Sequence, residues 1–267
     1  MFNNFIDYIA KCDREKIVGL QRNIKKFYYF YGVVFAVVFI RAIITNTTYL
    51  LIFFICLTVV VMAFYIISNF LIQMGINRIL TYELLPIKFL EIMEVSSSYK
   101  NGSKTMLDKA NYFLGKSLSY HSLGDFSESD KALRELDVER LQGLQKVQWH
   151  FLQSLNQYFQ TGDIDASSFK NKINEVVVKK EKSRLIISDR IKMLNGIEKL
   201  SKNITDNYFD ENHFESNFGR IQILYFRAQN QLLQGNKNKA KSIFQTIATE
   251  NPELFYVREA KQYLEEN

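Results

Sequence analysis

Cysteine and proline are scarce in this chain of 267 residues, and both scarcities narrow the possible architectures. The only cysteines, Cys12 and Cys56, have no metal-ligand neighbours, so neither a disulfide framework nor a cysteine metal site is expected. With Pro86 and Pro252 as the only prolines, long stretches are free to form uninterrupted helix. Few runs alternate β-branched with polar residues, as exposed strands would. The composition therefore favours an all-α protein in a reducing compartment.

Signatures of catalysis are also missing. The three histidines, His121, His150 and His213, are far apart and show no metal-ligand spacing. The sequence has no glycine-rich phosphate loop, no nucleophile elbow and no HExxH-type helix. Four acids flank the last histidine, and a solvated loop explains them better than a metal site does: Asp206, Asp210, Glu211 and Glu215. We therefore expect a protein that is not an enzyme and needs no cofactor or metal.

Charge is absent over a long interval, because no charged residue lies between Arg41 and Arg78. Within it, residues 49–72 supply the roughly 20 apolar residues that a helix needs to cross a bilayer. A second apolar run covers residues 27–44, and only the uncharged residues 45–48 separate the two. The pattern predicts a transmembrane hairpin over residues 27–75, with spans at about 27–44 and 49–72 and the lipid bilayer as a partner.

Arg41 lies near the end of the first predicted span. One interpretation is an interfacial anchor, since a long side chain can extend its guanidinium to the headgroups while its stem stays in hydrocarbon. The other is a pair with a buried acid on a partner membrane protein, because neither span contains an acidic residue.

The flanking charges predict the orientation of the hairpin. Residues 1–26 contain six Lys and Arg against three Asp and Glu, the hairpin loop has no charge, and Arg78 and Lys88 follow the second span. Positive residues resist translocation, so both termini are expected in the cytoplasm and the protein in the plasma membrane with two spans. A cleaved signal peptide is not expected, because a long charged segment precedes the apolar run.

Residues 1–26 form a predicted amphipathic basic helix with apolar residues at spacings of mostly three and four. Its apolar stripe is expected either to lie on the inner leaflet or to pack against the soluble domain. The net charge of +6 is not taken as a sign of nucleic-acid binding. We interpret the positive surplus as spread along the chain with acids interleaved, and the sequence has no nucleic-acid-binding motif.

The second span is predicted to run on until Pro86 breaks or kinks it. Residues 76–104 are predicted to hold the juxtamembrane helix that resumes after Pro86 and a linker over residues 96–103. Beyond them, four glycines each close an apolar-periodic stretch, at spacings of 38, 34 and 39 residues: Gly124, Gly162, Gly196 and Gly235. This is the length of a helical hairpin, in which glycine permits the left-handed backbone between two helices. Residues 105–267 are therefore predicted to be a helical repeat domain.

The last unit resembles the tetratricopeptide repeat family. Ala228 and Ala240 stand at the two small positions, Phe244 at the packing aromatic and Pro252 at the end of the second helix. Earlier units match less closely, and the second helix of the third unit, near residues 201–218, matches least. The resemblance implies an α-solenoid of about four helical hairpins, TPR-like, capped by a helix over residues 256–264.

The resemblance also implies a concave groove lined by the first helix of each repeat, where a partner peptide or helix binds. The partner-binding candidates are Asn111, His121, Trp149, Asn156, Gln222, Tyr225 and Gln229. Amides and a phenol on an otherwise apolar helix can form hydrogen bonds with the backbone of an extended peptide. Trp149, the only tryptophan, is either a core residue or a binding anchor.

Two functions are compatible with these features. The first is a membrane-anchored cytoplasmic adaptor or scaffold that binds a protein or peptide at the inner face of a bacterial membrane, accessory to a secretion, transport or peptide-signalling system. The alternative is an immunity-type membrane protein against a bacteriocin or toxin, in which the hairpin engages the target.

Overall fold

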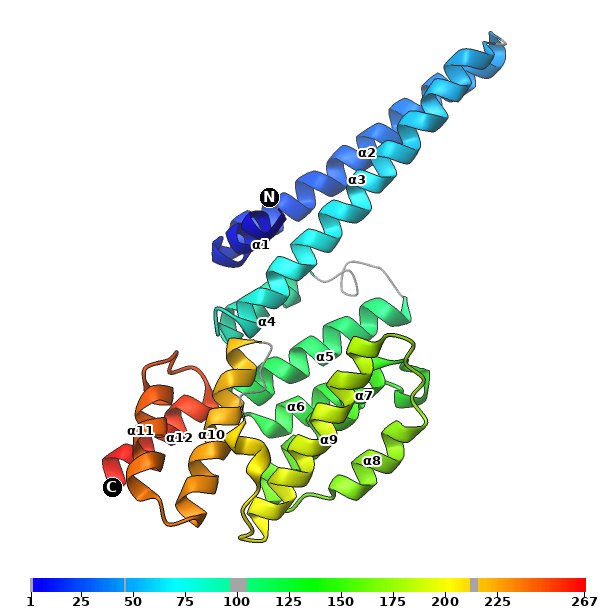
Figure 1. Ribbon diagram of the computed structural model, residues 1–267. Helices are drawn as coiled ribbons and strands as arrows, with labels where there is room; N and C mark the ends of the chain where they lie inside the picture. The colour runs from blue at the N-terminus through cyan, green and yellow to red at the C-terminus, as the bar shows by residue number, and fades with distance from the viewer. Residues whose placement is uncertain (1, 46, 97–104, 212–215) are drawn as a thin grey trace. The chain divides into compact units, whose positions relative to one another are not determined.

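The computed structural model describes all residues except 1, 46, 97–104 and 212–215 (Figure 1). Every regular element of the described residues is helical, which confirms the expected all-α class. The chain divides into two compact units, residues 1–79 and residues 80–267. Each unit is described by itself below.

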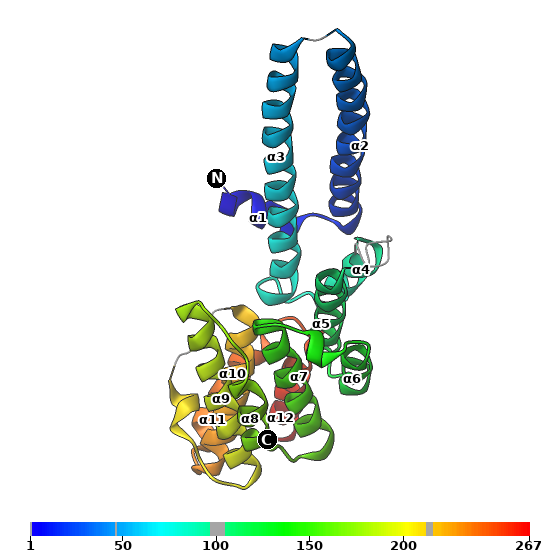
Figure 2. The ribbon, with the colours of Figure 1, turned by 90° about the vertical axis from the view of Figure 1, so that its right-hand side faces the viewer.

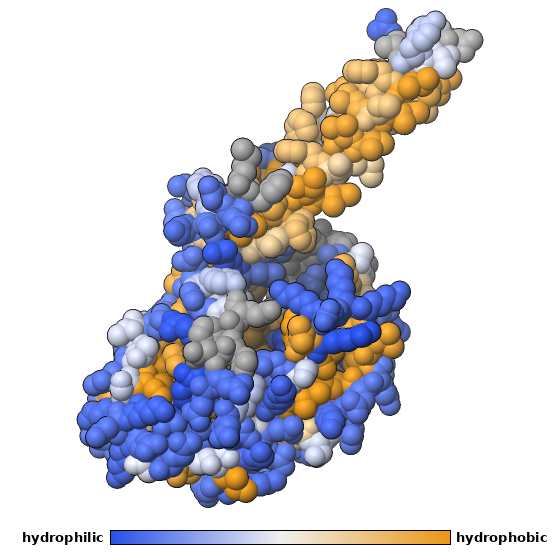
Figure 3. Space-filling view, viewed as in Figure 1, coloured by the Kyte–Doolittle hydropathy of each residue, from blue (hydrophilic) through white to orange (hydrophobic). Residues whose placement is uncertain are grey.

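The first unit is built on two long helices, α2 (Arg14–Ile44) and α3 (Thr48–Thr81), which run side by side in opposite directions (Figure 2). Both are long and apolar enough to cross a membrane. Only 6% of the apolar window of α2 and none of that of α3 is buried inside the protein, whereas a core helix of a soluble protein would be mostly buried. Apolar side chains therefore cover the outside of the hairpin (Figure 3).

The short helix α1 (Phe2–Lys11) packs across α3 through its apolar face. A Cβ at Gly75 would lie 2.5 Å from Cγ2 of Ile9, so glycine allows the close approach. The carboxylate of Asp7 also pairs with Nε of Arg78 at 2.9 Å. The predicted single helix over residues 1–26 is thus two helices, and the apolar stripe of the first packs on α3. Neither alternative drawn from the sequence anticipated that contact.

The second unit begins at Leu80, in the last turn of α3, which ends at Thr81. Pro86 is the first residue of α4, in agreement with the predicted break. The described helices of this unit are α4 (Pro86–Ser96), α5 (Met106–Ser122), α6 (Phe126–Arg134), η1 (Val138–Arg140), α7 (Leu144–Thr161), α8 (Ala166–Asn174), α9 (Glu181–Ser201), η2 (Asn207–Asp210), α10 (Asn217–Leu233), α11 (Lys237–Ala248) and α12 (Phe255–Glu266). Helices α5 and α6, α7 and α8, and α10 and α11 form adjacent pairs.

Glycine provides the turn in all three pairs. Gly124, Gly162 and Gly235 have φ of +78°, +75° and +78°, a left-handed conformation that residues with a Cβ adopt at a cost. The second helix of two pairs starts at an aspartate cap: Asp125 accepts from the backbone N–H of Glu128, and Asp165 from that of Ser168. The predicted hairpin turns at these three glycines are therefore present.

The turn expected at Gly196 is wrong. Gly196 lies inside α9, where a Cβ would sit 2.7 Å from the ring of Phe209, so this glycine serves close packing. The left-handed residue that ends α9 is Asn203, with φ of +58°. The element described after it is the 3₁₀ helix η2, and residues 212–215 lie outside the described part of the chain.

The core of the second unit runs from α7 to α12 and is rich in aromatic rings. Phe209, Phe226 and Tyr256 are completely buried in it. Phe159 connects two sides of the core, because its ring stacks on Phe126 at 4.8 Å and meets Phe255 edge-on at 5.1 Å between centroids. Helix α12 therefore packs against the earlier helices as well as against its neighbour α11.

Candidate functional site

His121, near the end of α5, is completely buried and has a partner for each ring nitrogen. Nδ1 lies 2.8 Å from Oδ1 of Asn156 on α7, and Nε2 lies 3.1 Å from the hydroxyl of Tyr256 on α12. Burial lowers the pKa of His121 to about 4, although the hydrogen bond to Asn156 and the charge of Asp130 act in the opposite direction. The ring is therefore neutral near pH 7.

The hydrogen bonds around Tyr256 have a consistent direction. Nε2 of Gln222 on α10 donates to the Tyr256 hydroxyl over 2.8 Å. The hydroxyl can then donate to Nε2 of His121, whose Nδ1–H donates to the Asn156 carbonyl oxygen. One phenol from α12 thus joins polar side chains of α5 and α10, and burial raises the pKa of Tyr256.

The network continues from Asn156 to helix α6. Nδ2 of Asn156 lies 2.8 Å from Oγ of Ser129 and 2.7 Å from Oδ1 of Asp130. The Ser129 hydroxyl donates to the carbonyl of Ser117 on α5, and the two serine hydroxyls are 2.8 Å apart. Gln160 binds the other oxygen of Asp130. Buried polar groups without partners are costly, so this chain of satisfied groups sets the relative positions of five helices.

Tyr225 and Gln229 border the same network on α10. Tyr225 is buried, and its ring centroid lies 5.2 Å from that of Tyr256. Its pKa is raised by burial, while a hydrogen bond to Gln229 acts in the opposite direction. Gln229 itself is half-buried.

Asn111 and Trp149 lie away from Tyr256. Asn111 is exposed, and its Oδ1 accepts from Nε2 of Gln145 at 3.0 Å. Nε1 of Trp149 donates to the carbonyl of Leu133 at 2.9 Å, which ties α7 to the end of α6. The structure therefore gathers four of the predicted groove residues around one tyrosine, with Gln229 beside them: His121, Asn156, Gln222 and Tyr225. Their contact with a partner stays a prediction.

Sequence reasoning missed the central residue of this network. Tyr256 belongs to the predicted cap, and its only local signal is an apolar stripe with Ala260 and Tyr263 at helical spacing. Its partner His121 is 135 residues away, so no local pattern connects the two. Asp130 was missed for the same reason.

Two further titratable groups lie on α7 and on its neighbour α9. The Arg190 guanidinium on α9 covers the ring of Phe151 at 4.7 Å, and burial lowers its pKa to about 10 against the opposing effect of Asp189. The His150 side chain is buried, and burial together with Lys172 and Lys146 lowers its pKa to about 4. Nη1 of Arg190 and Nδ1 of His150 have no hydrogen-bond partner among the described residues.

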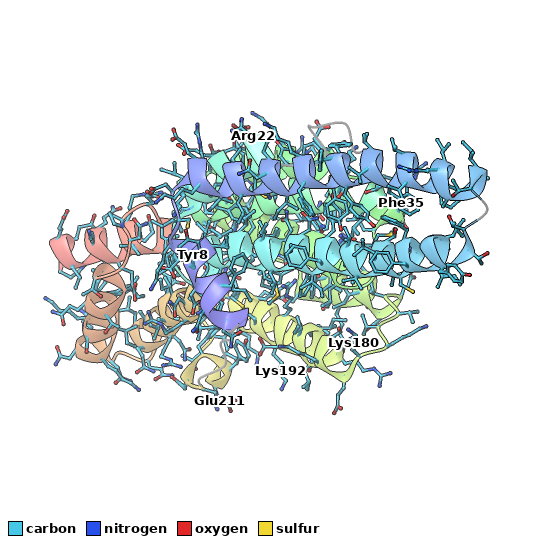
Figure 4. All side chains as sticks on the ribbon, turned by 90° about the horizontal axis from the view of Figure 1, so that it is seen from above. Tyr8, Arg22, Phe35, Lys180, Lys192 and Glu211 are labelled. Atoms are coloured by element: carbon cyan, nitrogen blue, oxygen red, sulfur yellow. The ribbon has the colours of Figure 1, made fainter. Side chains whose placement is uncertain are left out.

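The hairpin contains a cavity of about 360 Å³ between α2 and α3. The surface that lines it is almost entirely apolar and comes from Tyr28, Tyr31, Gly32, Phe35, Thr58, Met62, Tyr65 and Ile66. The hydroxyls of Tyr31 and Thr58 meet at 3.1 Å, and Phe35 lies between the two helices (Figure 4). Arg41 is exposed on the last turn of α2, where its carbonyl accepts from the hydroxyl of Thr45.

Among the described residues, no three His, Cys, Asp or Glu side chains gather as metal ligands, and His213 and Glu215 lie outside them. No protein-family model matches the chain, and no curated protein or solved structure shows significant similarity to it. Any statement of function therefore depends on the geometry of the two units.

Proposed function

We propose that the chain is a membrane-anchored adaptor: α2 and α3 hold it in the plasma membrane of a bacterium, and the helical repeats bind a protein or peptide on the cytoplasmic side. One observation carries the proposal. The residues expected to line a tetratricopeptide-like groove meet around a side chain of a separate helix, because Tyr256 of α12 hydrogen-bonds with His121 of α5 and Gln222 of α10.

The polar lining suits a specific occupant. An array with a purely apolar interior would accept any apolar helix, whereas a lining of imidazole and amide groups favours an occupant that offers matching donors and acceptors. In the structure, the phenol of Tyr256 on α12 already makes hydrogen bonds with this polar lining. In this proposal the partner is a helix or peptide with an aromatic residue, and it binds when α12 moves aside.

The proposal is tested by capture of partners from membranes and cytosol of the producing cells, with tagged full-length protein and tagged residues 80–267. The second unit has its own core, so the fragment is expected to fold. Both proteins should recover the same partner. Recovery by the full-length protein alone would place recognition in the first unit and contradict the proposal.

A matched pair of variants tests the role of α12. Nη2 of Arg258 donates to the carbonyl of Leu123 at 2.6 Å and so fastens α12 to the turn after α5. Arg258→Ala should loosen α12 and increase capture of the partner. Lys261→Ala removes an exposed cation of the same helix and should leave capture unchanged. Equal capture by both variants and the parent would exclude the groove beneath α12 as the binding site.

The cavity between α2 and α3 favours a second candidate, an immunity-type protein whose hairpin engages a membrane target. A side chain from a target helix would enter between Tyr31 and Tyr65, with Arg41 at the membrane edge. Arg41→Leu separates the candidates, because protection against the toxin would be lost under the second function while partner capture would persist under the first. Retained protection would argue against recognition through Arg41.

A further inference from the structure

The surplus of positive charge in the second unit is concentrated in one stretch of the sequence. Residues 170–192 contain eight Lys and Arg against three Asp and Glu, a net charge of +5. Residues 27–169 contain 11 against 12, and residues 193–267 contain 9 against 10, so each of these stretches has a net charge of −1. The even spread inferred from the sequence is therefore wrong: the surplus lies here and in the first 26 residues.

These basic residues are exposed and lie beside exposed aliphatic residues. The exposed cations are Lys170, Lys172, Lys179, Lys180, Lys182, Arg184 and Lys192. We call these seven residues, together with Val177 and Leu185, the α8–α9 basic surface. Val177, between α8 and α9, is 83% exposed, and Leu185 on α9 is 65% exposed. An exposed aliphatic residue alone is ordinary, but two of them among seven cations are not.

The local structure explains why these aliphatic residues stay outside. On α9, the outward face carries Leu185 and Lys192 seven residues apart, and the inward face carries the buried Met193 and Leu194. Arg190 stacks on Phe151 of α7 and fixes the rotation of the helix. Figure 4 shows Lys180 and Lys192 along the outer edge of α9.

We propose that the α8–α9 basic surface docks on an anionic lipid surface, an inference that rests on the proposed anchoring of the chain in a membrane. Lysines next to aliphatic side chains are the composition of interfacial membrane-binding segments, in which the cations attract anionic headgroups and the aliphatic groups enter the interface. The charge of the surface requires an acidic counterpart, and anionic lipids supply one.

Two observations favour lipid over an acidic protein. Residues 170–192 contain no aromatic residue, whereas specific protein interfaces concentrate their binding energy in tryptophan, tyrosine and arginine at a packed centre. The anchor also keeps the second unit close to the bilayer, since a domain of this size has a radius of gyration of about 16 Å. Tethering raises the effective concentration of lipid surface, so a shallow contact is sufficient.

A fluorescent probe on the surface tests the proposal. The full-length protein, with Cys12→Ser, Cys56→Ser and Val177→Cys, is labelled with an environment-sensitive dye and placed in nanodiscs. The discs contain either phosphatidylcholine alone or phosphatidylcholine with about 30% phosphatidylglycerol, an anionic lipid. Emission should shift to the blue only in the anionic discs, and high salt should reverse the shift because it screens the attraction.

A matched pair of double variants in the labelled protein separates this surface from charge in general. Lys179→Gln with Lys180→Gln should lose most of the blue shift. Lys237→Gln with Lys239→Gln, which removes the same charge from exposed positions on α11, should retain it. Equal emission in both kinds of disc, or equal loss in both variants, would overturn the proposal. A shift produced only by added polyglutamate would overturn it in favour of an acidic protein partner.

The same preparation distinguishes failure of docking from failure of the anchor. If the protein does not copurify with discs of either lipid, the membrane anchor of the proposed function is wrong and docking fails with it. If it copurifies with both and the probe shows no lipid dependence, only the docking inference is overturned.

Discussion

Two phenylalanines show how differently the two units treat apolar surface. Phe64 on α3 is 62% exposed, whereas Phe226 on α10 is completely buried. In water, exposure of so many large apolar side chains along two helices is strongly unfavourable. The contrast shows that α2 and α3, which are long and apolar enough to cross a membrane, leave their large apolar side chains exposed, whereas residues 80–267 bury theirs in a core.

The two units also differ in the hydrogen bonds between their helices. Across the hairpin, the Tyr28 hydroxyl donates to the carbonyl of Val61 and the hydroxyls of Tyr31 and Thr58 lie 3.1 Å apart. The second unit contains a continuous set of hydrogen bonds from Gln222 to Asp130. Most side chains of α2 and α3 are apolar and need no hydrogen-bond partner. In the second unit, the network links five helices.

The largest difference between the units should appear on truncation of these phenylalanines. Phe226→Ala should destabilise residues 80–267 by about 3–5 kcal/mol, because it leaves a cavity among packed rings. Phe64→Ala should leave the protein in the membrane with little change in stability, since lipid fills the space. Urea unfolding followed by circular dichroism measures the first effect, and membrane retention measures the second. A small effect of Phe226→Ala would contradict the described core.

Acid should affect the second unit more than the hairpin, since α2 and α3 contain no histidine. Burial lowers the pKa of His121 to about 4 in the folded protein, against 6.5 when unfolded, so the unfolded state binds the proton first. Stability from this residue is complete above pH 6.5 and falls as the pH approaches 4, by roughly 3 kcal/mol. His150 acts in the same direction.

Urea unfolding of residues 80–267 at a series of pH values measures this loss. His121→Gln should flatten the dependence, because glutamine does not titrate, and the slope from His150 should remain. An unchanged dependence in His121→Gln would show that His121 is not buried in its neutral form.

Loss of one hydroxyl tests the centre of the network. Tyr256→Phe leaves His121 and Gln222 without their shared partner and should cost about 1–3 kcal/mol. Tyr263→Phe is the control, because that ring packs on Phe244 and its hydroxyl makes no hydrogen bond among the described residues. Equal unfolding midpoints for both variants would remove Tyr256 from the centre of the network.

The smallest effect is expected at the contact of α1 with α3. Gly75→Ala places a Cβ against Ile9 and should weaken this packing by roughly 1 kcal/mol. Gly32→Ala is the matched change on α2, where the new Cβ would meet no atom of a neighbouring element within 4 Å, and it should leave the protection of α1 unchanged. Hydrogen exchange of the amides of α1 reports the difference. Equal protection in both variants would exclude the close contact at Gly75.

Local chemistry made much of the fold predictable from sequence. Apolar runs predicted the second half of α2 and most of α3, Pro86 predicted a break, and three glycines predicted turns, because each signal acts within a few residues. Gly196 failed as a signal because its role depends on Phe209, which the chain brings to it only in the folded state. The role of Tyr256 could not be predicted from local sequence for the same reason, because its partner His121 is 135 residues away.

The most direct test of the account concerns the membrane hairpin. In a protein without Cys12 and Cys56, single cysteines replace Thr45 in the hairpin turn and Val177 in the second unit, and wall-stripped cells are treated with a membrane-impermeant maleimide. Labelling of intact cells should occur at residue 45 and not at residue 177, which reacts only after permeabilisation. Labelling of residue 177 in intact cells, or protection of residue 45, would contradict the two-span anchor with the helical repeats inside the cell.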